Sequence, residues 1–150
     1  MNLRDVQTNV KTLLQAHPGL ALAPIVLDDG AGEANPQRTA ALKSLGFCLL
    51  VWRVEGGGMI DVSRTGAFVQ ELTVFVFIEE AVPVCRKEGG LNLRHEDATE
   101  YVMAALSGAR VGPDRFTLDN PPFDNLGRIN GVNRVLVNAL AQLTIAPLSS

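Results

Sequence analysis

Three consecutive glycines, residues 56–58, are the first candidate for chemistry, because backbone N–H groups of a glycine-rich loop can bind a phosphate. Such a loop leads the phosphate to the N-terminus of a helix, and in the common motif Gly-Lys-Ser/Thr completes it. Here the triplet is followed by residues 59–62 (MIDV), which have the composition of a strand. We therefore predict that the glycines form the tip of a hairpin and bind no cofactor.

Three groups of titratable side chains could serve acid–base chemistry or bind a cation. Residues 95–97 (His-Glu-Asp) begin a predicted helix, where the dipole favours acidic side chains and adjacent residues point in different directions. The pairs Glu79-Glu80 and Asp28-Asp29 each lie at the end of a predicted strand. We interpret residues 95–97 as a helix start and both pairs as solvated carboxylates, and we assign no metal site.

The two cysteines are candidates for a nucleophile or a disulfide. Cys48 and Cys85 both have apolar, strand-like surroundings, which favour buried reduced thiols. A reactive thiol needs basic and partly exposed surroundings. Arg86 and Lys87 make Cys85 the better candidate, but no local signature accompanies it. We therefore expect no catalytic residue and no enzyme activity.

Composition limits the class of protein. The chain has 150 residues, of which 47% are hydrophobic, and its net charge is −3. These values predict one globular domain, residues 1–150, without a general attraction for nucleic acid. No apolar run approaches the roughly 20 residues of a membrane span, and the N-terminus lacks the apolar core of a secretory signal. We expect no membrane partner, no specific nucleic-acid partner and synthesis in the cytoplasm.

Apolar residues at helical spacing predict three helices. The first covers residues 3–16, and the second follows an Asn-Pro cap over residues 36–45. The third covers residues 95–106. The first and third are the longest, so we expect these two to cover the sheet.

Strand-favouring residues fill the centre of the chain. The alternation is strongest over residues 68–79, where Leu72, Val74 and Ile78 share one face. Residues 131–145 alternate as a strand but also fit a helix, and we favour the strand. Residues 109–130 contain three prolines and predict a long loop that is functional, disordered or a hidden short strand. The other predicted strands are residues 24–27, 47–54 and 59–63, with a turn at 64–66. The fold class is therefore α+β, with a mixed, mainly antiparallel sheet and two principal helices packed on one face.

Several side chains are candidates for contact with another protein. Large aromatic residues on strands can anchor an interface. Basic residues beside the Gly89-Gly90 loop could contact an acidic partner, and an apolar pair within the predicted loop either folds over the core or docks on a neighbour. The candidate interface residues are Trp52, Phe75, Phe77, Arg86, Lys87, Phe123 and Leu126.

The order of elements resembles that of tail terminator and related tail-completion (minor tail) proteins of long-tailed bacteriophages. The resemblance is carried by the helix 3–16, the strands within 47–79, the helix 95–106, the loop with Asn120-Pro121-Pro122, and the final strand from Gly131. It implies a structural virion-assembly protein that forms a homo-oligomeric ring, typically hexameric, on the tail tube where the tube meets the head. Tail-tube and head-completion proteins would be its partners, and it would be cytoplasmic in the bacterial host before incorporation into a virion.

Two other functions are kept as alternatives. One is a small α/β enzyme or ligand-binding domain with a site near Glu79, Glu80, Cys85 and His95. Converging side chains with perturbed pKa values in a concave pocket would favour it. The other is a cytoplasmic adaptor unrelated to phage.

Overall fold

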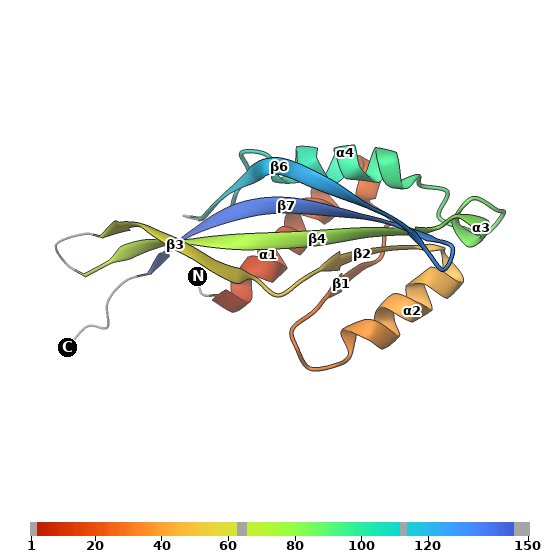
Figure 1. Ribbon diagram of the computed structural model, residues 1–150, viewed down its shortest axis with the longest axis horizontal. Helices are drawn as coiled ribbons and strands as arrows, with labels where there is room; N and C mark the ends of the chain where they lie inside the picture. Colours follow the sequence, from red (N-terminus) through yellow and green to blue (C-terminus); the bar gives the residue numbers. More distant parts are fainter. Residues whose placement is uncertain (1–2, 63–65, 112–113, 146–150) are drawn as a thin grey trace.

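A curled seven-stranded sheet is the centre of the molecule (Figure 1). The structure, a computed structural model, describes residues 3–62, 66–111 and 114–145. The strand order is β1-β2-β4-β7-β6-β5, and β3 pairs with β4 beside β2. Only the β1–β2 pairing is parallel in the described ranges, which confirms the mixed, mainly antiparallel sheet. The strands are β1 (Ile25–Leu27), β2 (Phe47–Val51), β3 (Glu55–Val62), β4 (Phe68–Ala81), β5 (Arg110–Val111), β6 (Asp114–Ile129) and β7 (Val132–Ile145).

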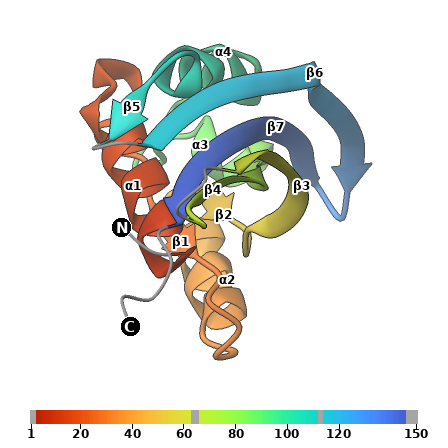
Figure 2. The ribbon, with the colours of Figure 1, turned by 90° about the vertical axis from the view of Figure 1, so that its left-hand side faces the viewer.

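Helices cover both faces of the sheet, but unequally. The two longest, α1 (Leu3–Ala16) and α4 (His95–Leu106), pack on one face as expected. The helix α2 (Ala34–Ser44) lies on the other face, over β1 and β2, and Figure 2 shows α4 and α2 on opposite sides. Two short helical turns, η1 (Pro18–Leu20) and α3 (Val82–Cys85), complete the set. In the described part of the chain, no helix is both long and apolar enough to cross a membrane.

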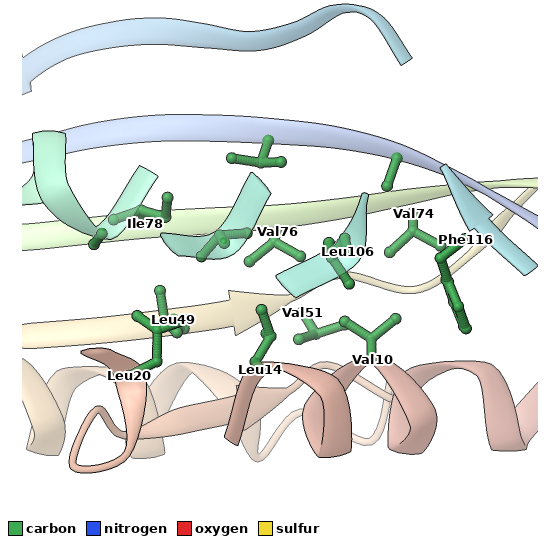
Figure 3. Close-up of a cluster of buried hydrophobic side chains, with 14 of the residues drawn as sticks. Val10, Leu14, Leu20, Leu49, Val51, Val74, Val76, Ile78, Leu106 and Phe116 are labelled. Carbon is green, nitrogen blue, oxygen red and sulfur yellow. The ribbon is translucent and has the colours of Figure 1, made fainter. Parts of the chain in front are cut away.

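The main core lies between the sheet and the helices α1 and α4. Alternate residues of β4, among them Val74, Val76 and Ile78, point toward these helices and are fully buried (Figure 3). Opposite them, Val10 and Leu14 come from one stripe of α1, because residues four apart share a helix face. Burying each such side chain stabilises the fold by about 1.5–3 kcal/mol.

A smaller core lies under α2. Val26, Cys48 and Leu50 are its buried members, and Leu42 of α2 packs against them. Beside this cluster the rings of Trp52 and Phe77 meet edge to face, with their centroids 5.9 Å apart. The end of β4 is thus covered on both faces, as its aromatic second face predicts.

The predicted long loop 109–130 is wrong, because β6 occupies most of it. The strands β6 and β7 form a hairpin whose turn is Asn130-Gly131, with φ angles of 52° and 78°. Both angles are positive, as in the two-residue turns that join twisted strands. Pro121 and Pro122 fall where the ladder is interrupted, between Leu118 and Phe123, so neither removes a ladder hydrogen bond. The strand predicted over 131–145 is confirmed.

The expected hairpin tip at residues 56–58 is also wrong, because these glycines lie inside β3. The register of β3 on β4 shifts on either side of Met59, and Gln70 bridges the irregularity by donating a hydrogen bond of 2.7 Å to the carbonyl of Gly57. A Cβ atom on Gly57 would lie 3.1 Å from the Glu71 carbonyl oxygen. Glycine at position 57 therefore allows the backbones of β3 and β4 to come close to each other. Most of the turn predicted at 64–66 falls outside the described residues.

Candidate functional site

Two consecutive carboxylates, Glu79 and Glu80, are fully buried near the end of β4. Adjacent residues of a strand point to opposite faces, so Glu79 faces the α2 side and Glu80 the α4 side. The expectation of a solvated pair is wrong. Both carboxylates remain buried because each is bound by an arginine, and a buried charge without such a partner is costly.

Glu79 joins three elements through two arginines. Arg38 of α2 donates hydrogen bonds to both carboxylate oxygens, and this interaction raises the pKa of Arg38. Arg134 of β7 places its Nε 3.1 Å from Oε2 of Glu79, without a direction suited to a hydrogen bond. Its guanidinium also lies over the ring of Phe77, 5.0 Å from the centroid. Through these contacts Glu79 links α2, β4 and the turn end of the β6–β7 hairpin.

Glu80 joins β4 to the start of α4. Arg86 donates to it from Nε at 2.8 Å and from Nη2 at 3.1 Å. The backbone N–H of His95 donates at 3.2 Å, and Nδ1 of His95 lies 2.7 Å from Oε1. Burial acts to raise the pKa of Glu80, but the hydrogen bonds from Arg86 and His95 together outweigh it, so this pKa lies below its usual range.

The ring of His95 lies between two carboxylates. Its Nε2 is 2.8 Å from Oε1 of Glu96, so these adjacent residues do meet, contrary to the expectation that they diverge. His95 starts α4 as predicted. In the described ranges, no group of three or more His, Cys, Asp and Glu side chains is arranged to hold a metal ion.

Both cysteines are buried and unpaired by a disulfide, as expected. Burial raises the pKa of Cys48 to about 12, and it also raises the pKa of Cys85. The thiol of Cys85 donates to the carbonyl of Leu93 at 3.3 Å. Of the side chains in the alternative enzyme site, the structure brings Glu80 and His95 together, places Glu79 on the other face and commits Cys85 to the backbone.

Two hollows flank the β6–β7 hairpin on opposite faces of the sheet. The acidic hollow, of about 290 Å³, lies between α4 and the hairpin. The basic hollow, of about 420 Å³, lies between α2 and the hairpin turn. The acidic hollow is lined by His95, Glu96, Glu100, Met103, Phe123 and Val135 among others. The basic hollow is lined by Arg38, Leu42, Lys43, Ile129, Val132 and Arg134 among others.

The far half of β6, residues 123–129, connects the two hollows. Phe123, Leu126 and Ile129 are exposed to 44%, 40% and 57%. Phe123 lines the acidic hollow and Ile129 the basic one. Large apolar side chains on a strand usually face a core, so this segment exposes apolar surface suited to a partner on both faces of the sheet.

The structure places the candidate interface residues in three settings. Trp52, Phe75 and Phe77 are half-buried near the α2 side of the sheet. Arg86 is bound to Glu80, and Lys87 beside it is exposed. Phe123 and Leu126 both belong to the far half of β6 and are partly exposed.

Sequence reasoning missed the cations of the basic hollow and Ile129. The signal that could have revealed Ile129 is the dipeptide Asn130-Gly131, which predicts a hairpin and therefore a strand before it. Compared with known proteins, the chain matches no family model and no curated protein.

Proposed function

We propose that this chain is a structural assembly subunit that completes its apolar surface against copies of itself. The observation that carries this proposal is the far half of β6, where three large apolar side chains are exposed within seven residues. Combined with the element order, it supports a subunit of the tail terminator or tail-completion type, which forms a ring on a phage tail tube.

The outer edge of β6 strengthens the case. β5 pairs with β6 only at Asp114 and Arg115, and the N–H of Phe116 bonds to the carbonyl of Ala109. Beyond that point, no other strand of the described chain pairs with this edge. An open edge with apolar side chains is a template for association, which monomeric proteins usually block.

A second feature suits a subunit that reaches its neighbours. The hairpin formed by β3 and the start of β4, together with the end of β7, projects beyond the helices (Figure 1). Phe68 and Val69 on this arm are only half-buried. An arm of sheet without helices on either face gains stability if another surface covers it.

The mass of the purified chain tests self-assembly. Light scattering and native mass spectrometry should give a defined multimer, and negative-stain microscopy should show closed rings. Phe123→Glu and Leu126→Glu should lower the mass of the assembly, because burying a carboxylate in the contact without a cationic partner is costly. Leu22→Glu is the matched control, since Leu22 is 82% exposed but far from β6 in the sequence. A monomer at every concentration contradicts the proposal.

The phage role is tested separately. Tubes assembled from the tail-tube protein encoded beside this gene should carry the chain at one end only, as seen by electron microscopy with a gold label. Binding along the whole tube, or none, contradicts the terminator role. Neighbouring genes that encode no capsid or tail proteins also contradict it.

A further inference from the structure

The geometry points to a head-to-tail contact in which the basic hollow of one copy receives Glu96 and Glu100, the acidic side chains exposed on α4, of the next copy. This inference rests on the proposed self-assembly and names its surfaces. The observation behind it is that the two hollows are opposite in charge and flank the same hairpin on opposite faces.

The basic hollow has an excess of positive charge. Arg38, Lys43 and Arg134 line it, and the carboxylate in contact with these arginines is the buried Glu79. Glu79 neutralises one of three cations, so the hollow keeps two positive charges. The Nε of Arg134 is buried and has no hydrogen-bond partner. Arginine presents several donors in a planar array that matches a carboxylate, so an acidic side chain fits this hollow.

The acidic hollow has the complementary character. Glu96 and Glu100 are exposed on α4 and line it beside the ring of His95. Glu80 beneath them is bound to Arg86, so it does not add an unpaired charge. Met103 and Phe123 supply apolar surface, as Leu42 and Ile129 do in the basic hollow. Each hollow therefore combines the two features that an interface centre needs, apolar contact area and charge.

The hollows lie on unlike surfaces of the chain. Val135 faces the acidic hollow and Arg134, the preceding residue of β7, faces the basic one. A contact between unlike surfaces occurs twice in a two-fold dimer, or repeats from copy to copy and generates a ring or an open filament. The ring of the proposed function requires the repeating arrangement, and the mass of the wild-type assembly distinguishes it from a dimer.

Two complementary variants test the contact. Lys43→Glu removes the excess charge of the basic hollow and leaves the acidic hollow intact, and Glu100→Lys does the converse. Each contact requires one surface of each kind, so either variant alone should be monomeric. Their equimolar mixture should recover assembly, because the intact surface of one variant meets the intact surface of the other, and the two reversed charges attract where the altered surfaces meet. Native mass spectrometry separates these species by mass.

Further variants keep the test decisive. Ile129→Glu and Phe123→Lys damage the same two surfaces more severely and should behave as the first pair does. Arg4→Glu and Glu33→Lys are controls with equal charge changes at exposed positions that line neither hollow. Both should assemble like the wild-type chain, and circular dichroism should confirm that every variant is folded.

The outcomes separate this inference from the proposed function. If the wild-type chain assembles and the variants of both hollows assemble equally well, the head-to-tail contact is wrong and self-assembly stands. If the two variants stay monomeric when mixed, the contact is also wrong. A wild-type chain that is monomeric at every concentration overturns both.

Discussion

The two halves of β6 carry phenylalanines in opposite circumstances. Phe116, in the first half, is fully buried against the helices of the main core. Phe123, in the far half, is 44% exposed beside an open strand edge. The first half is covered by helices of the same chain. The far half is joined to β7 by the turn Asn130-Gly131, close to the ion pair between Arg134 and Glu79. The comparison teaches that the described chain buries Phe116 completely but leaves Phe123 partly exposed, and in the proposed assembly a second copy covers the apolar surface that remains.

The largest expected effect comes from truncating the two rings. Phe116→Ala should lower the free energy of unfolding by about 3 to 5 kcal/mol, because it leaves a cavity in a packed core. Phe123→Ala should cost clearly less than Phe116→Ala in the monomeric state, since Phe123 is already 44% exposed. Urea denaturation at low protein concentration measures both. Equal losses of unfolding free energy for the two variants would contradict the difference between the two halves of β6.

The next effect concerns the ion pairs of Glu79, which lie near the turn of the β6–β7 hairpin. Glu79→Gln keeps the shape but removes the charge that binds Arg38 and Arg134, and it should cost about 2 kcal/mol. Hydrogen exchange should show faster opening of residues 123–134 than of β2. Uniform acceleration across the sheet would mean that Glu79 does not hold the hairpin in particular.

A smaller effect is expected at the turn. Gly131→Ala places a side chain at a φ of 78°, which should destabilise the hairpin by about 1 kcal/mol. The control is Gly56→Ala, because an added Cβ there meets nothing within 4 Å and its φ is not positive. Thermal melting of the two variants checks the difference, and a larger loss for Gly56→Ala would contradict it.

The smallest effect appears in the pH dependence. The pKa of Glu80 is lowered in the folded chain from its ordinary value of 4.5, so the unfolded chain takes up this proton first as the pH falls. The contribution of Glu80 is therefore fully present above about pH 4.5 and is lost as the pH falls through the folded value. Glu80→Gln should flatten the curve of unfolding free energy in that acidic range. An unchanged slope of unfolding free energy against pH would show that Glu80 does not cause this pH dependence.

Local patterns predicted most of the elements and few of the tertiary contacts. The spacing of Val6, Val10 and Leu14 identified α1, and the alternation from Leu72 to Ile78 identified β4. Residues 119–129 of β6 were not predicted as strand because their two prolines and five polar residues have little strand propensity, and pairing with β7 determines their conformation. The dipeptide Asn130-Gly131, which favours a two-residue hairpin turn, is the local signal for this strand.

The buried carboxylates could not be predicted from neighbouring residues. Glu79 and Glu80 are consecutive and acidic, which on local grounds favours solvent. The partners of Glu79, Arg38 and Arg134, are contributed by an earlier helix and a later strand, and Glu80 is bound by Arg86 and His95. Only the sheet order, which sets β7 beside β4 with Glu79 opposite Arg134, brings the charges together. A short window of sequence does not contain the information that determines such long-range pairing.

Hydrogen exchange of residues 123–129 tests the central claim most directly. The assembled chain and a folded monomeric variant, such as Phe123→Glu, are compared under the same conditions. If the far half of β6 is completed by a second copy, its amides exchange markedly more slowly in the assembly, while those of β2 exchange equally in both. Equal exchange of residues 123–129 in the two samples would contradict the claim.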